Sequence, residues 1–232
     1  MKIAIMQPYF LPYIGYWQLL NAVDKFVIYD NIQYTKKGWI NRNRFLQNGK
    51  EALFSIPINK GETCLNVDER TISSSFKKEK LINQFDNAYR CSPFFYDVFP
   101  IIKHVISYDD NNLFQYILHS IKVICSYLKI DSSKIVISSK ITIDHSLKSE
   151  NRVIALCHEL GANKYYNPIG GTSLYDKENF ANKNIILSFL QAQPFEYKQL
   201  THKFTPWLSI VDIMMFNSLD AVQEMLNKYS LE

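Results

Sequence analysis

Short apolar runs with strand character alternate with helix-like segments at both ends of this chain, and this alternation limits the possible folds. The apolar runs lie at residues 2–6, 26–30, 134–138, 164–167 and 185–190. Helical periodicity follows the first run, where Pro12 is well placed as the first residue of a helix, and follows the third, between Ser149 and a candidate cap at Gly161. Strands that alternate with helices favour a parallel sheet with right-handed crossovers. We therefore predict a single α/β domain, residues 1–232, with a mainly parallel, Rossmann-like sheet.

The middle of the chain, residues 73–129, lacks such strands and has helical periodicity throughout. Ser73–Ser75 is a candidate N-terminal cap for a first helix, and Ser92-Pro93 should end it and start a second, which Pro100 would kink or interrupt. A third helix should run from residue 113 to 128. We expect residues 73–129 to form a helical insertion, or cap, beside the sheet.

Two further segments have clear local patterns. Asn48-Gly49 is typical of a type I′ turn and predicts a β-hairpin between residues 39–46 and 52–58. The tail, residues 209–231, has the pattern of two amphipathic helices.

Composition excludes several classes of protein. The chain has 232 residues, 47% of them hydrophobic, but no apolar run near the ~20 residues that span a membrane. Its first strand meets Gln7-Pro8 too early for a signal peptide, so we expect a cytoplasmic protein without membrane insertion. The net charge of +4 is too small to favour nucleic-acid binding. Since neither CxxC nor HxxH spacing occurs, we expect no metal site.

Ligands of open parallel sheets bind beyond the carboxyl ends of the strands, and the segment from Gln7 to Tyr16 follows the first strand. Gly15 would allow close approach to the first helical turn, where the helix N-terminus favours an anion. We expect Gln7, Tyr13, Gly15 and Tyr16 to line a site. The alternative is that these aromatic residues only pack the helix against the sheet.

A basic segment, Lys36 to Arg44, is the second candidate. In a strand, Arg42 and Arg44 share one face, at a spacing that suits two bidentate contacts with phosphate or carboxylate. We expect these two arginines and Lys37 to bind phosphate. The alternatives are a solvated charged strand and internal ion pairs.

The third candidate segment follows the strand at 164–167. Asn167 with Gly170-Gly171 could hold a sugar or nucleotide through exposed backbone N–H groups, although a plain turn is the alternative. For a general base, Asp30 at a strand end and His202 in a loop are the candidates.

Taken together, these segments closely resemble the WbqC-like protein family over nearly the whole chain. The matching stretches are Ile5–Tyr16, Asp24–Asp30, Lys36–Arg44, Asn167 with Gly170-Gly171, Leu174–Asp176 and Leu208–Asp212. The resemblance implies a cytoplasmic protein of bacterial surface-polysaccharide (O-antigen) biosynthesis. It also implies a transferase or ligase that modifies a nucleotide-linked amino sugar by attaching an aminoacyl group, here glycyl. Its partners would then be a nucleotide-linked sugar and an amino acid.

The helix start Pro12–Tyr16 is also similar to the HxGH arrangement of nucleotidyltransferase-type Rossmann enzymes, such as pantothenate synthetase. Tyr13 and Tyr16 stand at the two histidine places, and a neutral tyrosine stabilises phosphate charge less well than an imidazole does. This likeness implies ATP with Mg²⁺ as cofactor of an amide-forming ligase. The alternative function is a non-catalytic sugar-nucleotide-binding or scaffold protein of the polysaccharide assembly.

Overall fold

The computed structural model describes residues 1–200 and 203–232, and within them one six-stranded sheet forms the centre of the molecule. Its strands are β1 (Lys2–Met6), β2 (Lys25–Ile28), β5 (Ile135–Ile137), β6 (Lys164–Pro168), β7 (Ile186–Ala192) and β8 (Tyr229–Leu231). Their order is β5-β2-β1-β6-β7-β8, and all neighbouring pairs are parallel except β7 with β8. The predicted α/β fold with a mainly parallel sheet is confirmed. Counted along the chain, the parallel strands have the order 3-2-1-4-5, as in doubly wound sheets.

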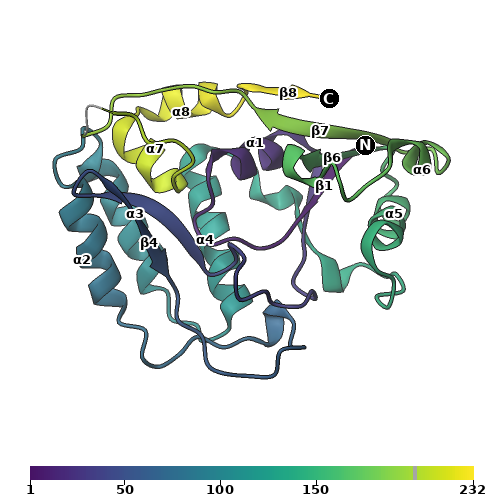
Figure 1. Cartoon of the computed structure of the whole chain (residues 1–232), viewed down its shortest axis with the longest axis horizontal. Helices are drawn as coiled ribbons and strands as arrows, with labels where there is room; N and C mark the ends of the chain where they lie inside the picture. Colours follow the sequence, from purple (N-terminus) through teal and green to yellow (C-terminus); the bar gives the residue numbers. More distant parts are fainter. Residues whose placement is uncertain (201–202) are drawn as a thin grey trace.

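Both faces of the sheet are apolar, because alternate residues of each strand point to opposite sides and each side meets helices. Ile3 and Ile5 of β1 face α5 (Ser149–Glu159) and α6 (Lys177–Ala181). Ala4 and Phe26 belong to the larger core on the other face, which α1 (Ile14–Ala22) and the remaining helices cover. Figure 1 shows α5 and α6 at one end of the molecule and most other helices at the other.

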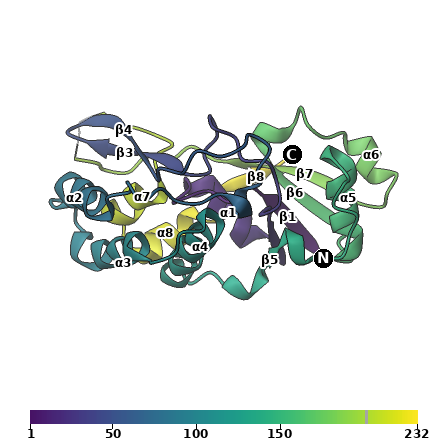
Figure 2. The same cartoon turned by 90° about the horizontal axis from the view of Figure 1, so that it is seen from below.

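The middle of the chain is helical, as predicted. Its helices are α2 (Lys78–Tyr89), α3 (Phe95–Ser107) and α4 (Leu113–Leu128), which pack side by side next to the sheet in Figures 1 and 2. The expected cap at Ser73–Ser75 is wrong, since α2 starts at Lys78 with Lys77 at the N-cap position. Pro100 lies inside α3, which continues through it.

The local turn predictions are largely confirmed. Asn48 and Gly49 have φ angles of 50° and 74°, as a type I′ turn requires, and they join β3 (Arg42–Gln47) to β4 (Lys50–Ser55) in a separate two-stranded sheet. Gly161 has a φ of 67°, which suits its place after α5. Ser149 is the first residue of α5 rather than its cap.

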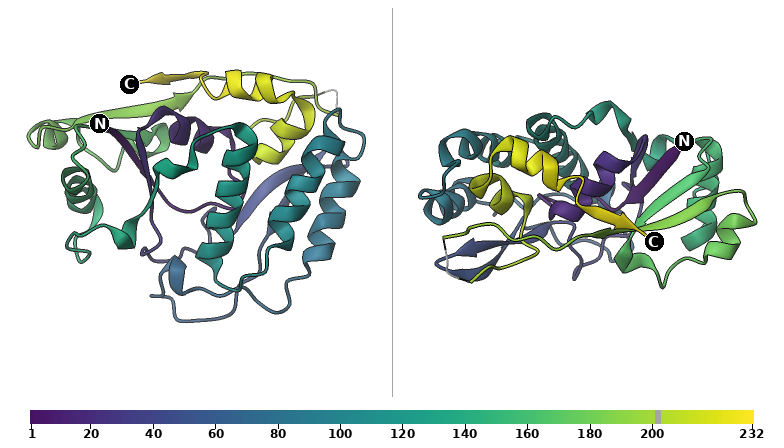
Figure 3. Two further views of the ribbon diagram at one scale, coloured as in Figure 1. Left: turned by 180° about the vertical axis from the view of Figure 1, so that it is seen from behind. Right: turned by 90° about the horizontal axis from the view of Figure 1, so that it is seen from above.

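The tail differs from the prediction at its end. It forms the two expected helices, α7 (Ile210–Phe216) and α8 (Leu219–Met225), and then β8, which the sequence did not predict. In Figure 3, β8 runs beside β7 at the edge of the sheet. Short 3₁₀ helices lie at η1 (Val67–Glu69), η2 (Ser132–Lys134), η3 (Ser138–Lys140) and η4 (Ile169–Gly171). In the part of the chain that the structure describes, no helix is long and apolar enough to cross a membrane.

Candidate functional site

Three segments that lie far apart in the sequence meet beside the N-terminus of α1. The loop after β1 contributes the carbonyl oxygen of Leu11, which accepts hydrogen bonds from Asn43 Nδ2 at 2.8 Å and Ser209 Oγ at 2.7 Å. The backbone N–H of Ser209 donates to the carbonyl oxygen of Arg44 at 2.8 Å. Hydrogen bonds therefore hold the loop, strand β3 and the segment before α7 in one arrangement.

A pocket of about 260 Å³ opens between these segments. We call it the aromatic pocket, and it is lined by Tyr9, Pro12, Tyr13, Trp39, Asn43, Arg44 and Trp207. Trp39 and Trp207 are 40% and 51% exposed, which is unusual for the largest apolar residues unless they contact a partner. The pocket wall therefore includes aromatic surface that a ligand can reach.

Trp207 is held in a strained backbone conformation at this pocket. Its φ angle is 60°, in the left-handed region that bulky residues rarely adopt. Its ring lies edge-on to that of Tyr13, with 6.1 Å between the ring centroids. Strain of this kind persists only where the surrounding structure imposes it, and it is common at binding and active sites.

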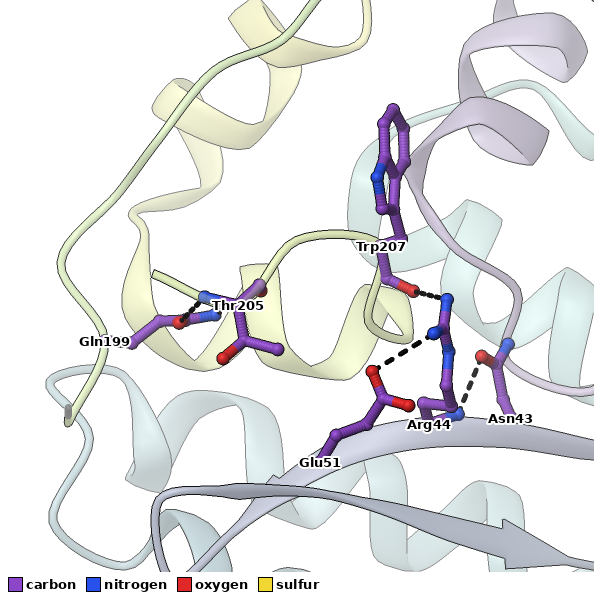
Figure 4. A network of polar contacts seen from close by, with 6 residues as sticks. All are labelled: Asn43, Arg44, Glu51, Gln199, Thr205 and Trp207. Atoms are coloured by element: carbon purple, nitrogen blue, oxygen red, sulfur yellow. Dashed lines mark hydrogen bonds and ion pairs between the residues drawn. The ribbon is translucent and has the colours of Figure 1, made fainter. Parts of the chain in front are cut away.

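A buried carboxylate anchors the segment that carries Trp207. Asp212 of α7 is fully buried and accepts hydrogen bonds from Tyr89 Oη at 3.0 Å, Tyr197 Oη at 2.6 Å and Gln199 Nε2 at 2.8 Å. Burial raises the pKa of Asp212 above its ordinary value. Gln199 also exchanges hydrogen bonds with the backbone of Thr205, two residues before Trp207 (Figure 4).

Gly15 allows a close approach, but what approaches it is a side chain of the same chain. A Cβ atom at this position would lie 2.5 Å from the ring of Tyr13 and 2.7 Å from its hydroxyl. The lack of a side chain at Gly15 therefore lets the Tyr13 ring lie against the first turn of α1, where it forms part of the pocket wall. Tyr13 therefore covers part of the N-terminus of α1.

Arg42 and Arg44 lie on one side of β3, as predicted, with their guanidinium groups 5.6 and 5.3 Å from the ring centroid of Trp39. Arg44 lines the pocket and donates to Glu51 at 3.1 Å and to the carbonyl of Trp207 at 3.2 Å (Figure 4). Arg42 instead donates to the carbonyl oxygens of Gly38, at 2.9 Å, and Lys37. Arg44 is therefore the arginine at the pocket, whereas Arg42 supports the loop that carries Trp39.

Two more predicted residues, Gln7 and Tyr16, lie next to Tyr9, which lines the pocket. Tyr9 Oη donates to Gln7 Oε1 at 3.2 Å, and Tyr16 Oη donates to the carbonyl of Gln7 at 3.3 Å. Tyr16 is buried, and its ring lies 5.8 Å from that of Tyr9. Burial, together with the nearby Tyr13, raises the pKa of Tyr9 to about 12, so its hydroxyl is neutral at physiological pH. Gln7 and Tyr16 thus support Tyr9 and do not line the pocket themselves.

The segments that build this pocket are among those that carry the family resemblance, and a model of the WbqC-like protein family matches residues 7–224. The chain belongs to the WbqC-like protein family. Uncharacterized protein Rv1507c of Mycobacterium tuberculosis (strain ATCC 25618 / H37Rv) is 28% identical to this WbqC-like protein over 216 residues, which are 92% of each chain. No solved structure matches this WbqC-like protein.

Other predicted residues of this WbqC-like protein lie outside the aromatic pocket. Asp30, at the end of β2, is buried and accepts two hydrogen bonds from Ser139, one from its backbone N–H at 2.9 Å and one from its hydroxyl. Lys37 is exposed, and its carbonyl oxygen accepts a hydrogen bond from Arg42. His202 lies outside the described residues. Catalytic roles for Asp30 and His202 stay predictions.

Asn167, Gly170 and Gly171 lie at the end of β6. Tyr165 Oη donates to Asn167 Oδ1 at 3.0 Å, and a Cβ atom on Gly171 would lie only 1.9 Å from Asn167 Nδ2. A Cβ atom on Gly170 would meet nothing within 4 Å. Gly171 therefore makes room for the Asn167 side chain, while Gly170 is an exposed residue of η4. Their proposed contact with a sugar or nucleotide stays a prediction.

The pocket of the WbqC-like protein also contains residues that the sequence did not single out. Tyr9 and Trp39 lie inside the candidate segments Gln7 to Tyr16 and Lys36 to Arg44. Their aromatic side chains, in loops expected to bind a ligand, could have identified them from the sequence. Trp207 could not be found in this way, because it reaches the pocket only through the fold. The same holds for Glu51, which does not line the pocket but pairs with Arg44. Asn43 explains why β3 is polar on its second face, since its amide is a buried link to Leu11.

Proposed function

We propose that this protein is a transferase or ligase of bacterial surface-polysaccharide biosynthesis that binds a nucleotide-linked amino sugar in the aromatic pocket. The observation that carries the proposal is the pocket wall, where half-exposed Trp39 and Trp207 stand with Arg44. Flat aromatic rings stack on nucleotide bases and on the apolar faces of sugar rings, and a guanidinium group pairs with phosphate oxygens. These are the chemical parts of a nucleotide-linked sugar.

The size of the pocket limits which part of this ligand enters it. A volume of about 260 Å³ is just below the ~300–1,000 Å³ of typical ligand pockets, so it suits one sugar or base ring but not a complete nucleotide sugar. The rest of the ligand would lie outside the mouth. The exposed Lys36 and Lys37 lie three and two positions before Trp39 in the chain and could meet the phosphates of the ligand.

The proposed reaction attaches an aminoacyl group, glycyl in the simplest case, to the amino group of the sugar. The amine nitrogen forms a bond to the activated carbonyl carbon and loses a proton, and the leaving group of the donor departs with its bonding electron pair. Glu51, which is ion-paired with Arg44 at 3.1 Å, is our candidate for accepting that proton. Stacking on the indoles would orient the sugar amine toward the donor.

The transferase and the ligase differ in the aminoacyl donor. A transferase takes an activated aminoacyl group, whereas a ligase takes the free amino acid together with ATP and Mg²⁺. Among the described residues, no three His, Cys, Asp or Glu side chains are grouped as a metal site. A Mg²⁺ ion would therefore be held largely by the nucleotide phosphates, as this ion often is.

A second candidate function is a non-catalytic sugar-nucleotide-binding or scaffold protein of the polysaccharide assembly. One observation favours it, which is that both carboxylates considered for acid–base chemistry have partners. Glu51 pairs with Arg44, and Asp30 accepts from Ser139. The same aromatic pocket would then bind the nucleotide sugar without changing it.

Scanning fluorimetry against nucleotides, nucleotide sugars and amino acids tests the binding. A ligand at ~100 times its dissociation constant adds ~2.7 kcal/mol, which should raise the melting temperature by roughly 5–10 °C. Trp39→Ala should lose this increase, whereas Tyr96→Ala should keep it, because Tyr96 is an 84% exposed aromatic residue on α3 that does not line the pocket.

Mass spectrometry of the bound sugar after incubation with activated glycine, or with glycine and ATP, separates an enzyme from a binding protein. An increase in the mass of the sugar by one glycyl group supports the transferase or ligase. Binding without any change in mass supports the scaffold. If no nucleotide sugar raises the melting temperature, or if Trp39→Ala responds like the wild type, the pocket assignment is wrong.

A further inference from the structure

A second pocket lies at the carboxyl end of β2, where ligands of parallel sheets commonly bind. It measures about 570 Å³ and shares no lining residue with the aromatic pocket. We call it the Arg152 pocket, and the residues that matter here are Tyr29, Asn31, His145, Lys148 and Arg152.

Arg152 carries a charge in this pocket that the described part of the chain does not neutralise. Its guanidinium group is partly buried and forms no ion pair with any described carboxylate. It contacts the carbonyl and side-chain oxygens of Asn31, at 3.2 and 2.5 Å, His145 Nδ1 at 3.4 Å, and the ring of Tyr29, whose centroid is 5.0 Å away. The ring face offsets part of the charge. Removing a cation from water is costly unless it is paired, so this environment favours an anionic ligand.

The neighbours of Arg152 fix its position. Arg152 can only donate, so the Asn31 atom that faces it is the oxygen, and the Asn31 amide nitrogen therefore faces His145 Nδ1 at 3.1 Å. Since that amide nitrogen also donates, His145 Nδ1 must accept. His145 Nε2 then carries the proton and donates to the carbonyl of Ile141 at 3.0 Å. Both ring nitrogens are engaged, so His145 positions Asn31, and Asn31 together with His145 Nδ1 positions the guanidinium.

Two further features make this pocket electropositive. Lys148 lines it, and the 11-residue helix α5 begins directly after this lysine. The N-terminus of α5 has no side-chain cap from the described residues, and helix N-termini attract anions. Glu150 of the first turn accepts from the backbone N–H of Asp176 at 3.0 Å, so its carboxylate is engaged at the start of α6.

We infer that the Arg152 pocket binds the phosphate group of a small phosphorylated ligand. Arg152 supplies a preset guanidinium, Lys148 a second cation, and α5 a helix N-terminus. This site does not depend on the function proposed for the aromatic pocket, because the two pockets have different lining residues.

Titration calorimetry with inorganic pyrophosphate at low ionic strength tests the inference on the full chain. Arg152→Gln keeps a donor for Asn31 but removes the charge, and it should weaken binding by about 10-fold or more. A control variant should bind as the wild type does. Arg90→Gln changes an arginine at the end of α2 that is paired with Asp86 and lies outside both pockets.

If Arg152→Gln does not fold, as judged by its thermal melt, Lys148→Met provides the same test with a residue that makes no hydrogen bond to Asn31. Equal affinity in Arg152→Gln and the wild type overturns the inference, and so does a wild type that does not bind pyrophosphate at millimolar concentration. Arg44→Gln, measured alongside, tells the two pockets apart: binding that is lost in this variant but kept in Arg152→Gln would place the anion in the aromatic pocket and overturn the inference. Binding of succinate but not of pyrophosphate would overturn the choice of phosphate.

Discussion

Replacing Gly15 with alanine tests whether this glycine acts through Tyr13. The added Cβ atom would lie 2.5–2.7 Å from three atoms of the Tyr13 side chain, far inside van der Waals contact, so the ring must leave its place. The ring is the end of a side chain that can rotate outward, and the backbone of α1 need not move. We therefore expect the aromatic pocket to lose one wall while the helix stays intact.

The expected change in stability is small because two terms oppose each other. Alanine in place of glycine in a helix stabilises by about 0.5–1 kcal/mol. Loss of the edge contact between Tyr13 and Trp207 costs about 0.5–1.5 kcal/mol. The free energy of unfolding should then change by less than about 1 kcal/mol, or roughly 2–4 °C in melting temperature for a chain of this size. Affinity for a nucleotide sugar should fall by about 10-fold, if the ring contributes one stacking contact.

A double-mutant cycle with Tyr13→Ala shows whether the effect passes through the ring. In the Tyr13→Ala protein, Gly15→Ala should leave affinity unchanged and should raise stability by about 0.5–1 kcal/mol, because only the helix term remains. Affinity comes from calorimetry, and stability from unliganded melts. The reasoning is refuted if Gly15→Ala weakens binding equally in both backgrounds, since the glycine would then contact the ligand directly.

Three further predictions concern stability. Trp207→Gly should be more stable than Trp207→Ala by about 1 kcal/mol in urea denaturation, because only glycine adopts a φ of 60° without strain; equal stabilities would contradict this. Burial raises the pKa of Asp212 above 3.8, so its contribution to stability is complete below about pH 4 and declines as pH rises through the folded-state pKa. The free energy of unfolding of the wild type, relative to Asp212→Asn, should therefore fall as pH rises from about 4, and a constant difference would be inconsistent with a raised pKa. Gly171→Ala should destabilise the protein by about 1–3 kcal/mol, because the added Cβ atom displaces the Asn167 amide from Tyr165. Gly170→Ala, the control, should be nearly neutral. Similar urea midpoints for the two variants would show that Asn167 has room to move.

Much of the fold could be predicted because its signals are local. The type I′ turn at Asn48-Gly49 and the helix from Leu113 to Leu128 depend on residues a few positions apart, and both are found where expected. The missed strand β8 shows the limit. Its three residues form a strand only because the edge of β7 is available beside them, and that edge is created by the tertiary structure.

The lining of the aromatic pocket was predicted in part for the same reason. Tyr13 and Arg44 were found because their segments have aromatic and alternating polar patterns that stand out in sequence. Trp207 was not, because it reaches Arg44 across 163 positions of the chain and no local pattern marks such a contact. The place of the Tyr13 ring beside Gly15 was not predicted, because the sequence cannot show which side chain takes the space at a glycine. A ligand contact at Gly15 stays a prediction.

The carbonyl of Leu11 accepts from Ser209, 198 positions further along the chain, and this long-range link affects how the protein matures. During synthesis, the first wall of the aromatic pocket leaves the ribosome long before the segment that contains Trp207. A nascent chain therefore has neither this link nor the cover that α7 and α8 give to the larger core. Contacts of such separation form late and slowly. The capacity to bind at this pocket should thus arise only when folding is nearly complete, and a chain truncated before residue 206 should lack it.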